Sequence, residues 1–314
     1  MRILFAGSPD LAVPSLVAVH ERYPVCGVLT NPDRPAGRSR HPEATAVKVK
    51  ALELGLPVLQ PRSFDEQLLE AAGKLDPELL VVVAFGTILR KDFLDLFPQQ
   101  GINVHASLLP RFRGPAPIAA AILAGDRETG VTVQRLALKM DAGEILAVRK
   151  VPLTGRETRG SLSEVLAVVG ADLLVSTLGA LERGEVRPVA QDEGQATYCR
   201  LVSKEDGRVD WAQDARVIER MIRAYDPWPR AYTHYRGQRL NLLAGGVYPG
   251  SLDATGKEEG LVLAFDNRYG ILVNTGRGVL FLTRLQLQAR KPLDWRSFLN
   301  GQKEFIGSQL GDIE

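Results

Sequence analysis

Two polar residues stand two positions apart near the end of an apolar segment, in GINVHASLLP from residue 101 to 110. Side chains on an extended strand alternate between its faces, so Asn103 and His105 are expected to point the same way. Together they would supply two hydrogen-bond donors, which suits the stabilisation of negative charge that develops on an oxygen. A lone histidine is also often a structural residue, and that alternative stays open.

A carboxylate that could partner the imidazole stands further along the chain, at Asp141 in the segment KMDAG. An aspartate close to a glycine is ordinary turn chemistry, which is the simpler interpretation. The apolar runs on either side, 131–138 and 144–153, are typical of a hairpin. Such a turn would lie at the edge of the sheet, where Asp141 could meet His105.

Several other kinds of chemistry lack their parts in this sequence. There is no G-x-S-x-G motif, Cys26 lies within an apolar strand, and no His, Cys and Glu residues have metal-ligand spacing. The first strand-to-helix turn, FAGSPD, lacks the G-x-G-x-x-G pattern, although Asp33 stands about where a ribose-binding acid would. A nicotinamide dehydrogenase is therefore disfavoured, and donors with a carboxylate fit acyl transfer in which the substrate is the nucleophile.

The elements that must position these residues follow an α/β pattern. Short apolar runs at 2–7, 25–30, 79–85 and 102–106 alternate with predicted helices at 9–21 and 64–72. Such runs are typical of a parallel sheet covered on both faces, which predicts a doubly wound, Rossmann-like domain. Ligands of such sheets bind beyond the carboxyl ends of the strands, where Asn103 and His105 stand.

A long helix, followed by a change to polar and aperiodic sequence, marks the end of this domain. The helix is predicted from a capping box at Ser161 and Glu164 to a stop at Gly184, and a similar box at Ser63 and Glu66 precedes the helix at 64–72. The chain then becomes polar and aperiodic, as in a linker. Beyond it, a helix at 214–224 precedes short alternating segments separated by glycines, which predict a small β-barrel or sandwich.

Bulk composition excludes some classes of protein. The 314 residues carry a net charge of +2 and are 45% hydrophobic, so a core can form and any basic binding surface must be local. Cys26 and Cys199 are too few for a disulfide framework or a thiolate metal site. No signal peptide is evident, and no apolar run approaches the roughly 18 residues that cross a bilayer. We expect a cytoplasmic protein with no membrane partner.

The motifs resemble those of the methionyl-tRNA formyltransferase family. INVHASLLPRFRGPAPI is similar to the signature of 10-formyltetrahydrofolate-dependent formyltransferases, and KMDAGEIL is similar to its second half. NPDRPAGR, SKEDGRVDW and DPWPRA resemble segments that mark the tRNA-specific branch. The likeness spans nearly the whole chain. It implies transfer of a formyl group from 10-formyltetrahydrofolate to the α-amino group of methionyl-initiator tRNA by direct amine attack, for initiation of translation.

The resemblance also implies roles for particular residues and parts of the chain. Asn103, His105 and Asp141 would be catalytic, with no metal. The implied domains are a catalytic domain at 1–188, a linker at 189–206 and an OB-like β-barrel that binds tRNA at 207–314, in a monomer. The implied folate-binding residues are Phe85, Gly86, Ile88, Leu89, Ser107, Leu108, Leu109 and Pro110.

A nucleic-acid acceptor requires a local basic surface. Basic residues outnumber acidic ones between Asn31 and Lys50 and again between residues 216 and 239, although such runs are also ordinary solvated faces. By resemblance, tRNA would be contacted by Arg34, Arg38 and Arg40, with Arg38 matching the family's residue most directly. The segment SRHPEATAVK departs from the family's more usual basic sequence, so the match to the family is weaker in this loop than at the trio.

Some alternatives stay open at this point. Arg111 and Arg113 are either ordinary loop charges or contacts to phosphate or the folate tail, and Trp228 either anchors the barrel or stacks on a base. A rival function keeps the chemistry but uses a nucleotide-linked amino sugar or water as the acceptor. Another rival is a noncatalytic nucleic-acid-binding protein built around the barrel.

Overall fold

The computed structural model describes residues 1–35, 42–252 and 256–311, and the chain forms two compact units. The first unit comprises residues 1–117, 128–153 and 162–200. The second comprises residues 118–127, 154–161 and 201–314. The predicted site residues of the trio and of the folate strip all belong to the first unit.

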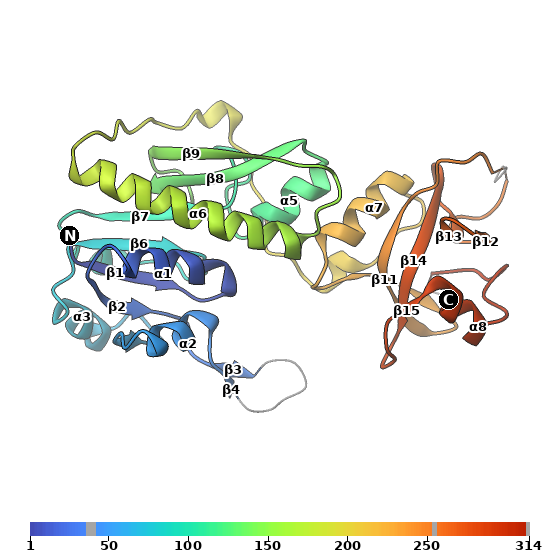
Figure 1. Ribbon diagram of the computed structural model, residues 1–314, viewed down its shortest axis with the longest axis horizontal. Coiled ribbons are helices and arrows are strands. Elements are labelled where there is room, and N and C mark those ends of the chain that lie inside the picture. The colour runs from blue at the N-terminus through green and yellow to red at the C-terminus, as the bar shows by residue number, and fades with distance from the viewer. Residues whose placement is uncertain (36–41, 253–255, 312–314) are drawn as a thin grey trace. The chain divides into compact units, whose positions relative to one another are not determined.

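The first unit is built on a seven-stranded sheet in the order β5-β2-β1-β6-β7-β8-β9 (Figure 1). The strands from β5 to β7 are parallel, whereas β8 and β9 run antiparallel and form the predicted hairpin. This arrangement confirms the doubly wound α/β prediction. The strands are β1 Ile3–Gly7, β2 Val25–Leu29, β5 Val58–Leu59, β6 Leu79–Val83, β7 Gly101–His105, β8 Glu128–Arg135 and β9 Ile145–Pro152.

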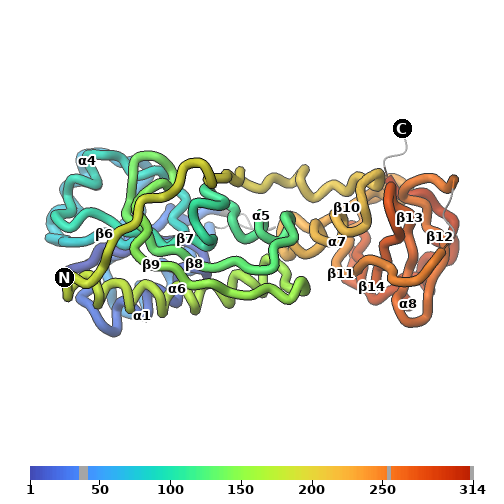
Figure 2. Tube along the Cα trace, turned by 90° about the horizontal axis from the view of Figure 1, so that it is seen from above, coloured from blue at the N-terminus to red at the C-terminus, as the bar shows by residue number. Residues whose placement is uncertain are grey.

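Helices cover both faces of this sheet. On one face Leu68, Ala72 and Phe93 pack in one apolar cluster with alternate residues of the central strands. Figure 2 shows α1 and α6 on the opposite side of the strands from α4, and α1 and α6 lie in front of the strands in Figure 1. The helices of this unit are α1 Val13–His20, preceded by the 3-10 turn Asp10–Ala12, α2 Ala46–Glu53, α3 Glu66–Gly73, α4 Lys91–Leu94 and most of α6 Arg159–Glu182, whereas α5 Pro117–Ala124 lies almost wholly in the second unit.

Both predicted capping boxes are wrong in their details. Helix α3 begins one turn later than Ser63, because the Asp65 carboxylate accepts the Leu68 N–H at 3.1 Å. Helix α6 begins at Arg159, before Ser161, because Thr158 caps it. The Thr158 hydroxyl oxygen accepts the Ser161 N–H at 3.2 Å, and the Ser161 hydroxyl oxygen accepts the Thr158 N–H at 3.0 Å. In each case a different short polar side chain is the cap: Asp65, two residues after Ser63, and Thr158, three residues before Ser161.

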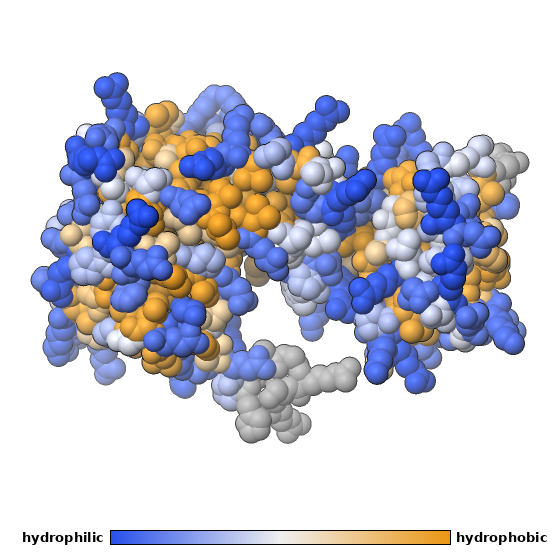
Figure 3. Space-filling view, viewed as in Figure 1, coloured by the Kyte–Doolittle hydropathy of each residue, from blue (hydrophilic) through white to orange (hydrophobic). Residues whose placement is uncertain are grey.

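Helix α6 corrects one further expectation. Its 24 residues are long and apolar enough, by length and composition alone, to cross a membrane. Half of its most apolar stretch is nevertheless buried inside the protein, as in the core helix of a soluble protein. Val165 and Val168 are exposed on this helix. Figure 3 shows hydrophobic residues gathered over the part of the first unit where α6 lies in Figure 1.

The start of the predicted linker packs against the first unit (Figure 2). The Val189 backbone pairs with Ile145 next to β9, and the Tyr198 segment pairs with Arg113. A 3-10 turn, Glu193–Gln195, lies between these two contacts. Residues up to Arg200 therefore belong with the sheet.

The second unit contains an antiparallel sheet in the order β10-β11-β14-β13-β12, with β15 paired to β14. Helix α7 Ala215–Ala224, capped by Asp214, buries Ile218 and Ile222 in the same core as strand residues Leu240 and Leu280. The fold agrees with the predicted helix and smaller β domain. The other elements are the 3-10 turn Glu205–Gly207, β10 Ala231–Tyr235, β11 Gln238–Val247, β12 Val262–Asp266, β13 Gly270–Asn274, β14 Val279–Leu287, β15 Leu293–Asp294 and α8 Trp295–Gly301.

Candidate active site

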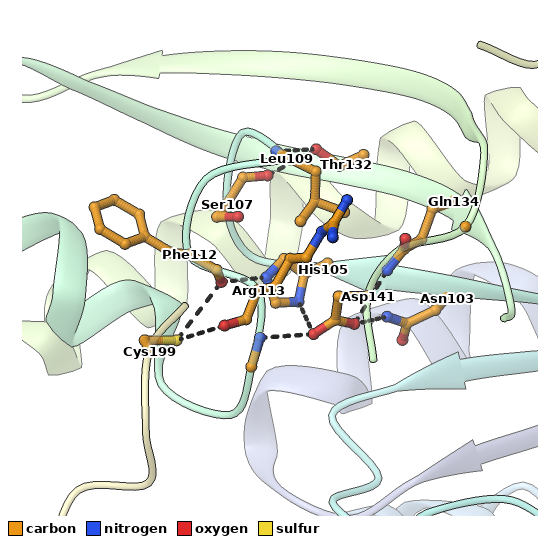
Figure 4. Close-up of polar contacts among 12 residues, drawn as sticks. Asn103, His105, Ser107, Leu109, Phe112, Arg113, Thr132, Gln134, Asp141 and Cys199 are labelled. Atoms are coloured by element: carbon orange, nitrogen blue, oxygen red, sulfur yellow. Dashed lines mark hydrogen bonds and ion pairs between the residues drawn. The ribbon is translucent and has the colours of Figure 1, made fainter. Parts of the chain in front are cut away.

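Asn103 and His105 lie on one face of β7, next to the carboxyl end of the strand (Figure 4). His105 is buried, and its Nε2 lies 2.9 Å from the Phe112 carbonyl oxygen. A carbonyl can only accept a hydrogen bond, so Nε2 must carry the hydrogen. The other ring nitrogen, Nδ1, is therefore the one that can face Asp141 or a substrate.

Asp141 lies in the turn between β8 and β9 and meets both residues. Its Oδ2 is 3.6 Å from Nδ1 of His105, and its Oδ1 accepts a hydrogen bond from Nδ2 of Asn103 at 3.2 Å (Figure 4). Oδ1 also accepts from Nε2 of Gln134 at 3.1 Å, and Oδ2 accepts the Gly114 N–H at 2.8 Å. The structure thus brings the predicted trio together around one carboxylate.

The geometry leaves hydrogen-bonding capacity for a substrate. A separation of 3.6 Å is an ion-pair contact and is longer than a hydrogen bond, so Nδ1 of His105 is not fully engaged. Because Nε2 already carries a hydrogen, an Nδ1–H exists only when the ring is the imidazolium. Asn103 uses one amide hydrogen on Asp141, and no second bond of this amide is formed within the part of the chain that the structure describes.

A tight turn from Phe112 to Gly114 supports the trio. Phe112 and Gly114 have positive φ angles of 57° and 116°. A Cβ at position 114 would lie 2.2 Å from the Cys199 carbonyl oxygen, so only glycine fits there. The Cys199 thiol donates to the carbonyl oxygens of Phe112 and Arg113, and burial raises the pKa of this thiol. Cys199 is thus a poor nucleophile although it lies beside the site.

The predicted folate strip at 107–110 is a hydrogen-bonded turn that follows His105 directly. The Thr132 hydroxyl donates to the Ser107 carbonyl oxygen at 2.7 Å and accepts the Leu109 N–H at 3.2 Å. The Ser107 hydroxyl donates to the Arg111 carbonyl oxygen at 2.6 Å, and the Leu109–Pro110 peptide is cis. Leu108 and Pro110 are half-buried, whereas Ser107 and Leu109 are buried.

The predicted folate segment at 85–89 is divided between core and surface. The Phe85 side chain is buried in the core under the sheet, so only the backbone of this residue can contact a ligand. Gly86 is exposed with a φ of 76°, Leu89 is half-buried, and Ile88 is 78% exposed. Ile88 therefore offers an apolar surface that a flat ring could cover.

The loop predicted to contact tRNA is described only in part. Arg34 is exposed in β3 Arg34–Pro35, which pairs with β4 Pro42–Glu43. Arg38 and Arg40 lie outside the described residues. Hydrogen bonds from Gln60 at 2.7 Å and Lys48 at 2.6 Å hold the pKa of Asp33 below its usual value. Asp33 thus anchors the base of the loop.

No metal site accompanies these residues. Within residues 1–35, 42–252 and 256–311, no group of three or more His, Cys, Asp or Glu side chains is arranged to hold an ion. Arg113, left open between a loop charge and a ligand contact, is fully buried with its guanidinium bound by protein groups. Arg111 is exposed, and its guanidinium lies 4.7 Å from the centre of the Phe112 ring.

The sequence matches two family models along almost its whole length. Residues 1–178 match the formyl transferase model, and residues 201–303 match the formyl transferase C-terminal domain. The methionyl-tRNA formyltransferase of Roseiflexus castenholzii (strain DSM 13941 / HLO8) is 47% identical over 317 residues, covering 99% of each chain. That of Treponema denticola is 42% identical over 316 residues, covering 98% of each.

This chain belongs to the methionyl-tRNA formyltransferase family.

Solved structures share the fold of this methionyl-tRNA formyltransferase family member at low sequence identity. WlaRD, a sugar 3N-formyl transferase, aligns with a TM-score of 0.67 at 16% identity over 93% of this chain and 99% of its own. The methionyl-tRNA formyltransferase from Clostridium thermocellum gives 0.55 at 18% over 80% and 95%. HypX from Aquifex aeolicus, in complex with tetrahydrofolic acid, gives 0.63 at 20% over 98% of this chain and 48% of HypX.

Sequence reasoning missed several residues around the trio of this methionyl-tRNA formyltransferase family member. Gln134 and Gln191 lie next to Asp141. Asn31, which follows β2, forms hydrogen bonds with the 85–89 segment. Nδ2 of Asn31 donates to the Phe85 carbonyl oxygen at 2.6 Å, and its Oδ1 accepts from the Thr87 hydroxyl at 2.9 Å. Only the position of Asn31 directly after a strand gave a signal.

Proposed function

We propose that this chain transfers the formyl group of 10-formyltetrahydrofolate to the α-amino group of methionyl-initiator tRNA, for initiation of translation. The observation that carries the proposal is the convergence of Asn103, His105 and Asp141 around one carboxylate at the end of β7. Family membership over the full length of the chain supports the same reaction. The curated relatives of this length bear the name of that activity.

The reaction needs little help with its nucleophile and more with its oxygen. An α-amine has a pKa of about 7.7 to 8.0, so a useful fraction is neutral near pH 7. The amine nitrogen bonds to the formyl carbon, the bond from that carbon to the donor nitrogen breaks, and one proton passes from the amine to the leaving nitrogen. Charge gathers on the formyl oxygen in between, and preorganised donors lower the barrier there.

The trio supplies groups of the right kind for these needs. Asn103 would donate its remaining amide hydrogen to the formyl oxygen, and the imidazolium of His105 would donate from Nδ1. Asp141 would favour that charged imidazolium and would help to route the proton that the amine loses, through water. The Phe112 carbonyl and the Gly114 N–H keep His105 and Asp141 in place during the transfer.

The donor would lie across the two predicted strips. The turn at Ser107, Leu108, Leu109 and Pro110 follows the catalytic histidine directly and is held by Thr132. The backbone at Phe85 and Gly86 offers hydrogen-bonding groups, and Ile88 and Leu89 offer apolar surface. Such a mixture of backbone polar groups and apolar side chains suits a pteridine ring.

The acceptor would be bound by both parts of the chain. Arg34, Arg38 and Arg40 would contact tRNA from the first loop, and the domain at 207–314 would hold it from the barrel, with 1–188 as the catalytic domain and 189–206 as the linker. Arginine suits these contacts because its planar fork pairs with phosphate and base edges. We further propose that the chain works as a monomer in the cytoplasm.

The test is formyl transfer from labelled 10-formyltetrahydrofolate, offered in parallel to methionyl-initiator tRNA, methionyl-elongator tRNA, free methionine and no acceptor. Rapid labelling of the initiator alone supports the proposal. Labelling of a nucleotide-linked amino sugar, added as a fifth acceptor, or release of free formate without an acceptor, overturns the choice of tRNA. No use of the donor in any arm overturns the chemistry.

A further inference from the structure

Arg113 is an arginine with no exposed surface, which is unusual for a charged side chain. Its guanidinium donates to Gln191 Oε1 from Nε at 3.0 Å and from Nη2 at 2.9 Å. It also donates to Glu193 Oε1 at 2.8 Å and to the Tyr198 hydroxyl at 3.1 Å. A buried guanidinium is costly unless it is fully paired, and here every one of these partners comes from residues 191–198.

The pairing with Arg113 fixes which way the Gln191 amide faces. A guanidinium has no acceptor, so the two bonds from Arg113 must end on the amide oxygen. The amide nitrogen of Gln191 then faces away from Arg113, toward the turn that carries Asp141. It donates to the Asp141 carbonyl oxygen at 2.8 Å and to the Gly143 carbonyl oxygen at 2.7 Å.

The same logic continues to the carboxylate of Asp141. The Gln191 amide nitrogen has only two hydrogens and also lies 3.1 Å from Gln134 Oε1, so one hydrogen is shared with that oxygen and the Gln134 nitrogen faces the other way. That nitrogen donates to Asp141 Oδ1 at 3.1 Å, and Gln134 is only 2% exposed. One chain of donors therefore runs from Arg113 through Gln191 and Gln134 to Asp141.

The turn that this chain of donors holds would be difficult to maintain otherwise. Asp141 has a φ of 50°, a conformation that a residue with a side chain adopts at a cost in free energy. A Cβ at Gly143 would lie 1.9 Å from the Arg135 carbonyl oxygen, so this turn packs tightly on β8. Lys139 of the same turn and Arg113 both bind Glu193, at 2.6 and 2.8 Å, which secures the segment that carries Gln191.

We propose that Gln191 is a positioning residue for the transfer reaction: oriented by Arg113, it holds the backbone of Asp141 and, through Gln134, aims the Asp141 carboxylate at His105 and Asn103. This inference rests on the proposed function. Gln191 acts on the reacting groups only through Asp141. Its loss should therefore slow the chemical step and leave both substrates bound as before.

Gln191→Glu is the sharpest variant, because Gln191 is only half-buried and a glutamate keeps an acceptor for Arg113. It loses the amide donors to Asp141, Gly143 and Gln134 and adds a negative charge beside Asp141. Gln191→Ala removes both functions without added charge. The matched control is Gln195→Ala, an exposed glutamine of the same segment whose amide binds only Asp192 within the described structure.

The experiment measures kcat, both KM values, the pH profile of kcat and the melting temperature of each variant in the methionyl-initiator tRNA assay. We expect kcat to fall about 10- to 100-fold in Gln191→Glu and about 10-fold in Gln191→Ala, with each KM within about 3-fold of wild type. The acid-side limb of the kcat profile should move to higher pH in Gln191→Glu, because the added negative charge favours protonation of the neighbouring Asp141 carboxylate.

The outcomes separate the two proposals. If the wild type is active and both Gln191 variants keep its kcat and pH profile, the positioning role is overturned and the proposed function stands. A loss in Gln191→Ala and Gln191→Glu that appears only in the melting temperature, or equally in Gln195→Ala, shows a structural role and also overturns it. A wild type that formylates no methionyl-tRNA overturns the proposed function, and the positioning role with it.

Discussion

Nδ1 of His105 lies 3.6 Å from Oδ2 of Asp141, although His105 ends β7 and Asp141 stands in the turn between β8 and β9. Nε2 of the same ring is committed to the Phe112 carbonyl oxygen at 2.9 Å. The imidazole is thus fixed at one nitrogen and loosely paired at the other. Nε2 therefore holds the ring in the protein, and Nδ1 can face a substrate.

Removal of either donor should slow the transfer far more than it weakens donor binding. We expect His105→Ala and Asn103→Ala each to lower kcat by about 100-fold or more, because each removes a donor to the charged oxygen. The KM for 10-formyltetrahydrofolate should change little. Steady-state kinetics with a separate folate-binding measurement check this, and equal losses in kcat and folate affinity would refute the oxyanion role.

Gly114→Ala should reduce both stability and activity. Its φ of 116° and the 2.2 Å approach to the Cys199 carbonyl oxygen leave no room for a methyl group. We expect the free energy of unfolding to fall by about 1 to 3 kcal/mol and kcat to fall as the Gly114 N–H moves away from Asp141. Urea denaturation measures the first effect. Gly73→Ala, at the open end of α3, is the control and should leave the free energy of unfolding unchanged or raise it by up to about 1 kcal/mol, because alanine is the better helix former.

The Glu193 contacts should make stability depend on pH in the acid range. Hydrogen bonds from Arg113 and then Lys139 lower the pKa of Glu193 from 4.5 to about 2. A carboxylate with a lowered folded-state pKa stabilises the protein above its unfolded pKa and loses that contribution as the pH falls through its folded pKa. Glu193→Gln should therefore lower the melting temperature at pH 7, and its difference from wild type should shrink between pH 4.5 and about 2.

The control for the Glu193 experiment is Glu21→Gln, an exposed carboxylate at the end of α1. Its melting temperature should follow wild type across the same range. A Glu193→Gln difference that stays constant from pH 7 to pH 2 would contradict the assigned contacts. Thermal melts in a series of buffers at constant ionic strength are sufficient for both variants.

Recognition of tRNA should be weakened by charge removal in the first loop. Arg38→Ala should raise the KM for methionyl-initiator tRNA and leave the KM for the donor unchanged, and Arg34→Ala should do so more weakly. If Arg38 contacts a phosphate, the slope of log affinity against log salt should fall by about 1. Arg149→Ala, an exposed arginine of β9, is the control. An unchanged tRNA response in Arg38→Ala removes that residue from the interface.

The sequence predicted those parts of the site that depend on local periodicity. Alternation along a strand placed Asn103 and His105 on one face, and two apolar runs joined at KMDAG placed Asp141 at a hairpin turn. Both relationships follow from the geometry of a few neighbouring residues. The strands of the sheet were predictable for the same reason, since each is a short continuous apolar run.

The supporting contacts were not predictable, because they join distant segments. Gln134 lies within an apolar strand and Gln191 lies in a polar, aperiodic stretch, so neither shows a pattern before the chain folds. Arg113 looks like an ordinary loop charge until residues 191–198 close over it. The predicted starts of α3 and α6 were wrong for a simpler reason. Asp65 and Thr158 compete with nearby serines as caps, and only the folded backbone decides between them.

The most direct test of the account is the single-turnover rate of formyl transfer to methionyl-initiator tRNA by Asp141→Asn, beside wild type, with both substrates saturating. Asparagine keeps the shape of the side chain but removes the negative charge that lies 3.6 Å from Nδ1 of His105. We predict a rate about 100-fold or more below wild type with unchanged folate affinity. A rate close to that of wild type would contradict a catalytic role for the pair of His105 and Asp141.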